Sequence, residues 1–248
     1  MNLVLLCGFA RGLACFQRLL RMKVHISQVF AYPEDPHEIV YSTSIAELAM
    51  QKGIECRITR NVAAPEHQAT WDRAKPSLGV VIGWRSMIPS AIHRMPSLGS
   101  VAIHDSLLPR YRGFAPTNWA IINGETETGA TLFHLDNEMD GGDIIDQRSV
   151  SIRLDDNAHT LAERMIPHYE DLVEQNVPLL LEGKASRRPQ NQSDATYCIW
   201  RTPEDGLIDW NMPASRIHNL VRALAIPYPG AFTIWEGKKL LVWKAQLL

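Results

Sequence analysis

The sequence predicts an α/β fold with a mostly parallel, Rossmann-like sheet, followed by a small strand-rich subdomain. Short apolar runs alternate with stretches whose apolar residues recur at helical spacing, which is typical of crossover connections between parallel strands buried on both faces. A polar segment, residues 185–194, then separates this pattern from a tail rich in strand signals. The apolar runs of strand length are residues 2–7, 24–31, 78–83 and 100–104.

The remaining elements follow from local patterns and their stop signals. Helices are predicted where apolar periodicity ends at a glycine or polar pair, and strands where short apolar stretches alternate. The predicted helices are 8–20, 44–51, 117–122, 160–181 and 213–225; the further strands are 129–135, 144–152 and 196–200, with a hairpin at 230–248 turning at Glu236-Gly237. The expected domains are residues 1–186 and 187–248.

Composition argues against several classes of protein. The chain has 25 Lys and Arg against 27 Asp and Glu, a balance unlike that of a protein that binds nucleic acid chiefly through phosphates. No apolar run approaches the roughly 18 residues of a membrane span, and residues 1–10 lack a basic leader. The four cysteines show no metal-site spacing, so we expect no metal, and reduced thiols in a cytoplasmic protein.

His104 is the leading catalytic candidate. It stands where the fourth apolar run ends, and ligands of parallel sheets bind beyond the carboxyl ends of the strands. The acidic run 136–143 could supply a carboxylate that orients the imidazole. From the residues alone, His104 could instead be a structural histidine, and the run 136–143 could be a solvated acidic loop. A calcium-binding loop is disfavoured, because the run lacks the ligand spacing of an EF-hand.

Other residues near His104 suit ligand binding rather than catalysis. Arginine recognises phosphate and carboxylate groups in bidentate fashion, although surface arginines are also common. The spacing Gly8-x-x-x-Gly12 lacks the G-x-G-x-x-G pattern, which favours a tight turn over dinucleotide binding. The candidate substrate-binding residues are Trp84, Arg85, Ser106, Arg110 and Arg112.

The segment HDSLLPRYRGFAPTNWAIINGETETGATLFHLDNEMDGGDI, residues 104–144, resembles the signature of the formyltransferases that use 10-formyltetrahydrofolate. The stretch RTPEDGLIDWNMPASRIHNLVRALAIPYPGAFTIWEG, from Arg201 onward, resembles the second subdomain of that family. The resemblance covers nearly the whole chain, more weakly at residues 34–42. It is strongest toward nucleotide-sugar N-formyltransferases, such as the domain that acts on UDP-4-amino-4-deoxy-L-arabinose.

The resemblance implies a role for several positions. An acceptor amine attacks the formyl carbon of the folate, His104 manages protons or stabilises the developing oxyanion, and Asp140 holds His104. Ala102 stands where the family usually has an asparagine donor, a loss that costs roughly 3–4 kcal/mol in comparable enzymes. Phe114 stands where close relatives often have arginine. The folate-binding segments are Ser86, Met87 and Ile88, and the loop Asp136, Asn137, Glu138, Met139 and Asp140, acting largely through backbone groups.

The function expected from the resemblance is formylation of the amine of a nucleotide-linked amino sugar, as in lipopolysaccharide biosynthesis. A formyltransferase for a small amine such as N-hydroxyornithine is an alternative, and a methionyl-tRNA formyltransferase would be longer and carry a basic insertion. Because Ala102 lacks a donor, a folate-binding pseudoenzyme is the alternative outside the enzymes. A homodimer formed through the C-terminal part is a further expectation.

Overall fold

A seven-stranded sheet forms the centre of the molecule in the computed structural model, which describes residues 1–36 and 38–247. The strand order is β3-β2-β1-β4-β5-β7-β8; the first five strands pair in parallel, and β7 pairs antiparallel with both β5 and β8. The mostly parallel sheet predicted from the sequence is therefore confirmed. The strands are β1 Leu3–Cys7, β2 Ile26–Ala31, β3 Cys56–Ile58, β4 Leu78–Ile82, β5 Ser100–His104, β7 Glu127–His134 and β8 Ile144–Ser151.

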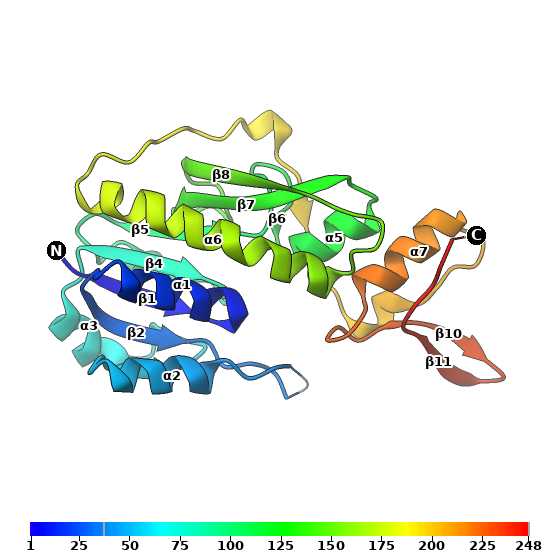
Figure 1. Cartoon of the computed structure of the whole chain (residues 1–248), viewed down its shortest axis with the longest axis horizontal. Helices are drawn as coiled ribbons and strands as arrows, with labels where there is room; N and C mark the ends of the chain where they lie inside the picture. The colour runs from blue at the N-terminus through cyan, green and yellow to red at the C-terminus, as the bar shows by residue number, and fades with distance from the viewer. Residues whose placement is uncertain (37, 248) are drawn as a thin grey trace.

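Helices cover both faces of the sheet (Figure 1). One face packs against α1 Phe9–Arg21, α2 Ser42–Gln51 and the long α6 Ala158–Leu181. The other face packs against α3 Gln68–Ala74 and the short α4 Ser90–His93. Because both faces are buried, strands β1, β4 and β5 are apolar over nearly their whole length, which explains why they appear in the sequence as continuous apolar runs.

Strand alternation decides which residues of β5 reach each face. Val101 and Ile103 belong to the core beneath α1 and α6, whereas Ala102 belongs to the core on the opposite face. Since side chains alternate with a period of two, His104 projects to the same side as Ala102. Strand β5 thus places His104 and Ala102, the position where the family usually has asparagine, next to each other on one face of the sheet.

The C-terminal part is a small unit at the end of the sheet toward which the parallel strands point (Figure 1). Helix α7 Ala214–Ala223 packs on α5 Pro116–Ile122, and the hairpin β10 Ala231–Trp235 and β11 Lys238–Val242 turns at Glu236 and Gly237 as predicted. Its apolar core consists of Ile208, Val221, Leu224 and Ala231. Single 3-10 turns occur at Pro65–His67, Gln192–Asp194 and Pro203–Gly206.

The polar segment 185–194, predicted as a linker or domain edge, is paired with the sheet domain. Ile144 and Arg188 exchange backbone hydrogen bonds of 2.8 and 2.9 Å. Beyond it, the predicted strand 196–200 shrinks to β9 Tyr197–Cys198, which pairs in parallel with β6 Arg112–Gly113. The segment is therefore attached to the sheet domain, and the boundary at 186/187 stays a prediction.

No helix among the described residues is both long and apolar enough to span a membrane. Within the same residues, no cluster of three or more His, Cys, Asp or Glu side chains is arranged to hold a metal ion.

The ends of β1 and β4 approach so closely that two glycines meet there. A Cβ on Gly83 would lie 2.6 Å from the Gly8 carbonyl oxygen, and Gly83 has a φ of +68°. Gly53 has the same φ, but nothing lies within 4 Å of its added Cβ. Comparing alanine substitutions at Gly83 and Gly53 therefore separates the free-energy cost of the left-handed backbone from that of the steric clash.

We expect Gly83→Ala to destabilise the protein more than Gly53→Ala. The left-handed conformation costs an alanine about 1–2 kcal/mol at either position, and the clash at position 83 adds about 1–3 kcal/mol. Urea denaturation of both variants measures the difference. Equal losses in the free energy of unfolding would contradict this expectation, because they would show that the backbone at the β1–β4 junction shifts to accommodate the added Cβ.

Candidate active site

A cavity of about 540 Å³ opens beyond the carboxyl ends of β4 and β5. This volume lies within the range of about 300–1,000 Å³ that is usual for small-molecule sites. The sheet contributes Val81, Ala102 and His104, and the C-terminal unit contributes residues 200–203 and 228–230. The cavity therefore lies between the sheet domain and the small C-terminal unit, where parallel sheets typically bind ligands.

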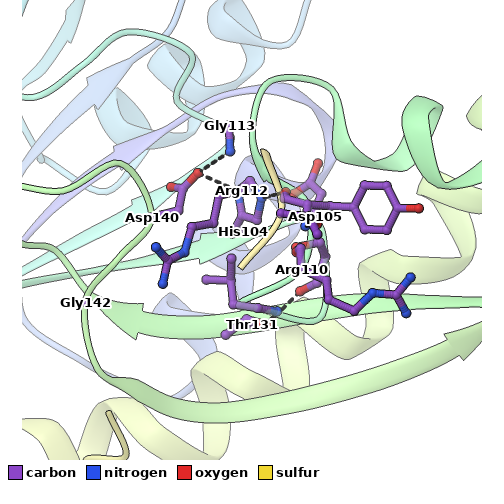
Figure 2. Close-up of polar contacts among 12 residues, drawn as sticks. His104, Asp105, Arg110, Arg112, Gly113, Thr131, Asp140 and Gly142 are labelled. Atoms are coloured by element: carbon purple, nitrogen blue, oxygen red, sulfur yellow. Dashed lines mark hydrogen bonds and ion pairs between the residues drawn. The ribbon is translucent and has the colours of Figure 1, made fainter. Parts of the chain in front are cut away.

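His104 lies between two acceptors on the wall of this cavity. Its Nδ1 is 3.5 Å from Oδ2 of Asp140, and its Nε2 is 2.7 Å from the backbone oxygen of Tyr111 (Figure 2). Only a doubly protonated ring can donate to both groups at once, whereas a neutral ring donates to one of them. Each ring nitrogen thus has an oxygen of the protein beside it, which fixes the orientation of the imidazole.

Asp140, which contacts His104, is itself fixed by a hydrogen bond and by the conformation of its loop. Its Oδ2 accepts a hydrogen bond of 2.8 Å from the backbone N–H of Gly113. Its φ of +52° is unusual for a residue with a side chain. Two residues later, a Cβ on Gly142 would lie 1.8 Å from the carbonyl oxygen of His134, so the loop can pass there only as glycine. The predicted pairing of His104 with Asp140 is present in the structure.

A second charged network adjoins His104 and was missed by the sequence analysis. Asp105 lies 3.3 Å from Nη2 of Arg11 and accepts a hydrogen bond of 2.5 Å from the hydroxyl of Tyr169. Burial and the Asp105 carboxylate raise the pKa of Tyr169 well above its ordinary value, so this hydroxyl remains a donor. Arg11 and Asp105 both line the cavity, which brings a fixed pair of opposite charges beside the histidine.

Trp84 and Arg85 also reach the cavity, as predicted from the sequence. Arg85 makes two hydrogen bonds to Glu38, of 2.6 and 3.0 Å, and its guanidinium lies 4.2 Å from the centroid of the Phe9 ring. Trp84 packs edge-on against Tyr32 with a centroid distance of 4.9 Å. The structure therefore provides a second arginine that is oriented before any ligand arrives.

Three of the predicted substrate-binding residues, Ser106, Arg110 and Arg112, do not line the cavity, and their role in binding stays a prediction. Ser106 is buried and donates to the Arg110 carbonyl, while Arg110 pairs with Glu125 at the surface. Arg112 is fully buried and hydrogen-bonds to side chains of the C-terminal segment. Figure 2 shows the two guanidinium groups pointing to opposite sides of the site.

The two segments expected to hold a folate lie on the same cavity. Ser86, Met87 and Ile88 line it, as do four of the five residues of the acidic loop: Asp136, Glu138, Met139 and Asp140. Asn137 is the exception, because its Oδ1 faces outward and accepts a hydrogen bond from Arg94. Apolar residues from the strands, Val81, Phe133 and Leu135, complete this wall. A flat ring system with polar edges fits such a surface, so the residues present suit a pterin.

Aromatic side chains from distant parts of the chain close the opposite side of the cavity. Phe114, which stands where relatives often have arginine, packs edge-on against Trp200 with a centroid distance of 5.2 Å. Trp200 is 62% exposed, so its ring is open to a ligand. Tyr228 and Pro229 follow from the C-terminal unit. The sequence analysis did not select Trp200, Tyr228 or Pro229 as site residues, and the fold brings them to the cavity.

The site contains no reactive thiolate among the described residues near Asp140. Burial, and after it the Asp140 carboxylate, raises the pKa of the Cys198 thiol to about 12. The thiol is therefore protonated at neutral pH, when nucleophilic cysteines must be ionised. This favours direct transfer between two bound molecules over a covalent intermediate on Cys198.

Ala102 lines the cavity on the same face of β5 as His104 and is 8% exposed. We expect Ala102→Asn to add a donor beside the histidine and to raise kcat by about tenfold, since one oxyanion donor is worth about 10²-fold in comparable enzymes. Steady-state kinetics checks this, with Ala102→Leu as a control of similar bulk. An unchanged kcat in the asparagine variant would show that another group already stabilises the oxyanion.

Comparisons with known proteins agree with this geometry. The family model described as formyl transferase matches residues 9–173, and the model of the formyl transferase C-terminal domain matches residues 201–248. A methionyl-tRNA formyltransferase of Caldanaerobacter subterraneus is 40% identical over 205 residues, or 82% of this chain. The chain spans only 66% of the length of that relative.

Solved structures show the same fold at low identity. A sugar N-formyltransferase from Shewanella aligns with a TM-score of 0.79 at 19% identity, over 100% of this chain and 99% of the other. A 4-N formyltransferase from Francisella tularensis gives 0.77 at 20% identity, over 100% and 98%. WlaRD, a sugar 3N-formyl transferase solved with dTDP and 5-N-formyl-THF, gives 0.73 at 20% identity, over 96% and 84%.

Proposed function

Because the chain belongs to the formyl transferase family, we propose that it transfers a formyl group from 10-formyltetrahydrofolate to the amine of a nucleotide-linked amino sugar. The observation that carries the proposal is the His104–Asp140 pair, which lies on one cavity with both expected folate-binding segments. A cavity with a fixed histidine and carboxylate can move the proton that such a transfer requires.

The protein residues have distinct tasks in this reaction. When bound, the folate supplies an activated formyl carbon, to which the acceptor amine forms a bond while the bond to the folate nitrogen breaks. His104 takes up the proton that the amine loses as it bonds to the formyl carbon, and delivers that proton to the leaving nitrogen of the folate. Asp140 orients the ring and stabilises its charged form.

Two features support a nucleotide-linked acceptor. Arg11 and Arg85 line the cavity close to Phe9, and arginine is well suited to bidentate contact with phosphate oxygens. Sugar N-formyltransferases share the fold over the whole of this chain. A sugar of this kind would serve lipopolysaccharide or another surface polysaccharide, made from cytoplasmic precursors.

Methionyl-tRNA is the competing acceptor, favoured by the 40% identical relative. Against it stands the charge of the chain, with 25 basic and 27 acidic residues and no insertion rich in lysine and arginine. Binding tRNA through phosphates needs a concentrated basic surface. A small amine such as N-hydroxyornithine is the other competitor.

The test is a transfer assay with one donor and three classes of acceptor. The protein is incubated with 10-formyltetrahydrofolate and UDP- or dTDP-linked amino sugars, N-hydroxyornithine, or methionyl-tRNA, and formylated products are identified by mass spectrometry. We expect product from a nucleotide-linked sugar, and none from the free amino sugar at the same concentration. Product from methionyl-tRNA alone, or from no acceptor despite folate binding, would contradict the proposal.

A further inference from the structure

Arg112 and Gln190 form a buried network behind the catalytic pair. Arg112 is fully buried and Gln190 is 9% exposed, although they lie 78 positions apart in the chain. The pairing of β6 with β9 brings the two segments together. No residue of the network lines the cavity, so its role cannot be contact with a ligand.

Every polar atom of the Gln190 side chain is used. Its Nε2 donates to the carbonyl oxygens of Asp140 and Gly142, both at 2.7 Å. Its Oε1 accepts from Nε and Nη2 of Arg112, at 3.1 and 2.6 Å. A flipped amide would direct its N–H groups at the guanidinium, so Arg112 fixes which end of Gln190 faces the loop.

The loop that Gln190 holds is under conformational strain. Asp140 has a φ of +52°, and a backbone of this kind is unfavourable for a residue with a side chain and persists only where its surroundings impose it. The two carbonyls that Gln190 contacts flank Gly141, immediately after the carboxylate that faces His104. Gly113 N–H holds the carboxylate itself, but Gln190 holds the backbone from which it extends.

We propose that Gln190 is a positioning residue for formyl transfer, which sets the place of Asp140 and, through Asp140, the orientation of His104; Arg112 orients Gln190. The inference rests on the proposed function for its kinetic consequence. Its structural part stands on the ligand-free protein alone, because the contacts from Arg112 to the Asp140 loop exist without any substrate.

Kinetics of three variants tests the proposal. Gln190→Met keeps the length of the side chain but removes all four hydrogen bonds, and we expect kcat to fall about 10–100-fold, since a small misplacement of a catalytic group has effects of this size. KM for the acceptor should change by less than about threefold, because Gln190 does not line the cavity and its hydrogen bonds go to the Asp140 loop and Arg112, not to Arg11 or Arg85. Gln192→Met is the matched control: Gln192 also accepts from Arg112 but does not touch the loop.

Gln190→Glu separates the two ends of the side chain. A glutamate keeps, and strengthens, the contact with Arg112 but loses both donors to the loop carbonyls. We expect it to be impaired to the same extent as Gln190→Met. Full activity of Gln190→Glu, or equal losses in Gln190→Met and Gln192→Met, would overturn the proposal, because either result assigns the network to folding alone.

A measurement without substrate distinguishes failure of this proposal from failure of the proposed function. The ring ¹⁵N resonances of His104 are recorded in the ligand-free protein, assigned with His104→Ala. Gln190→Met should move the Nδ1 resonance, which faces Asp140, while Gln192→Met should leave it in place. Unmoved resonances in Gln190→Met would overturn the positioning role even if the wild-type protein formylated no acceptor at all.

Discussion

Replacing His104 with alanine is expected to lower kcat by about 10³-fold, because the proposal makes it the general acid–base group and such catalysis contributes roughly 10²–10⁴-fold. The side chain is 10% exposed and faces the cavity, so its removal leaves the apolar cores of the sheet intact. The variant should still bind the folate, since the expected pterin-binding segments, 86–88 and 136–140, are both retained. Single-turnover transfer and a folate-binding titration measure the two effects separately.

His25→Ala is the control for this experiment. His25 is exposed and immediately precedes β2, at the end of the sheet opposite the cavity. The activity of His25→Ala should equal that of the unmodified protein. If His104→Ala retained more than about a tenth of the activity, the histidine would not be the proton-transfer group.

Replacing Asp140 with asparagine is expected to lower kcat by at least about 10²-fold while the protein keeps its melting temperature within a few degrees. The asparagine has the same shape and can still accept from Gly113, but it lacks the charge that stabilises a protonated His104. Losing the orienting carboxylate of a catalytic histidine has effects of this order or larger. Steady-state kinetics and thermal unfolding measure the two properties.

Asp143→Asn is the matched control, three positions along the same loop. Its carboxylate pairs with Arg187 at 3.2 Å and is 34% exposed, so it changes the net charge equally without touching His104. We expect less than a twofold change in kcat, since exposed ion pairs contribute little. If both variants lost activity alike, the effect would come from the charge of the loop as a whole rather than from contact with His104.

The sheet could be predicted because its strands are buried on both faces and therefore appear as apolar runs. Strand β3, Cys56–Ile58, was missed: it is three residues long at the sheet edge and two of its residues are exposed. Helices α3 and α4 were missed because seven and four residues are too few to show a helical period. Strands β6 and β9, of two residues each, exist only through their pairing with each other.

The contact between His104 and Asp140 was predictable for a different reason from the residues that surround it. His104 ends an apolar strand, and the resemblance supplied Asp140. The direction of Arg112 could not be predicted, because β9, 85 positions away, decides which side of β6 is buried. Arg11 and Gln190 stand in segments that appear as a helix and a polar linker, and only tertiary packing gives them a place near the site.

The cavity between the sheet and the C-terminal unit has a consequence for how such a protein can change over time. His104 and Asp140 belong to β5 and the loop after β7, whereas Trp200, Arg201, Tyr228 and Pro229 come from the small unit. The two walls are therefore encoded by separate stretches of the chain, so substitutions in residues 200–203 and 228–230 can reshape one wall without replacing His104 or Asp140.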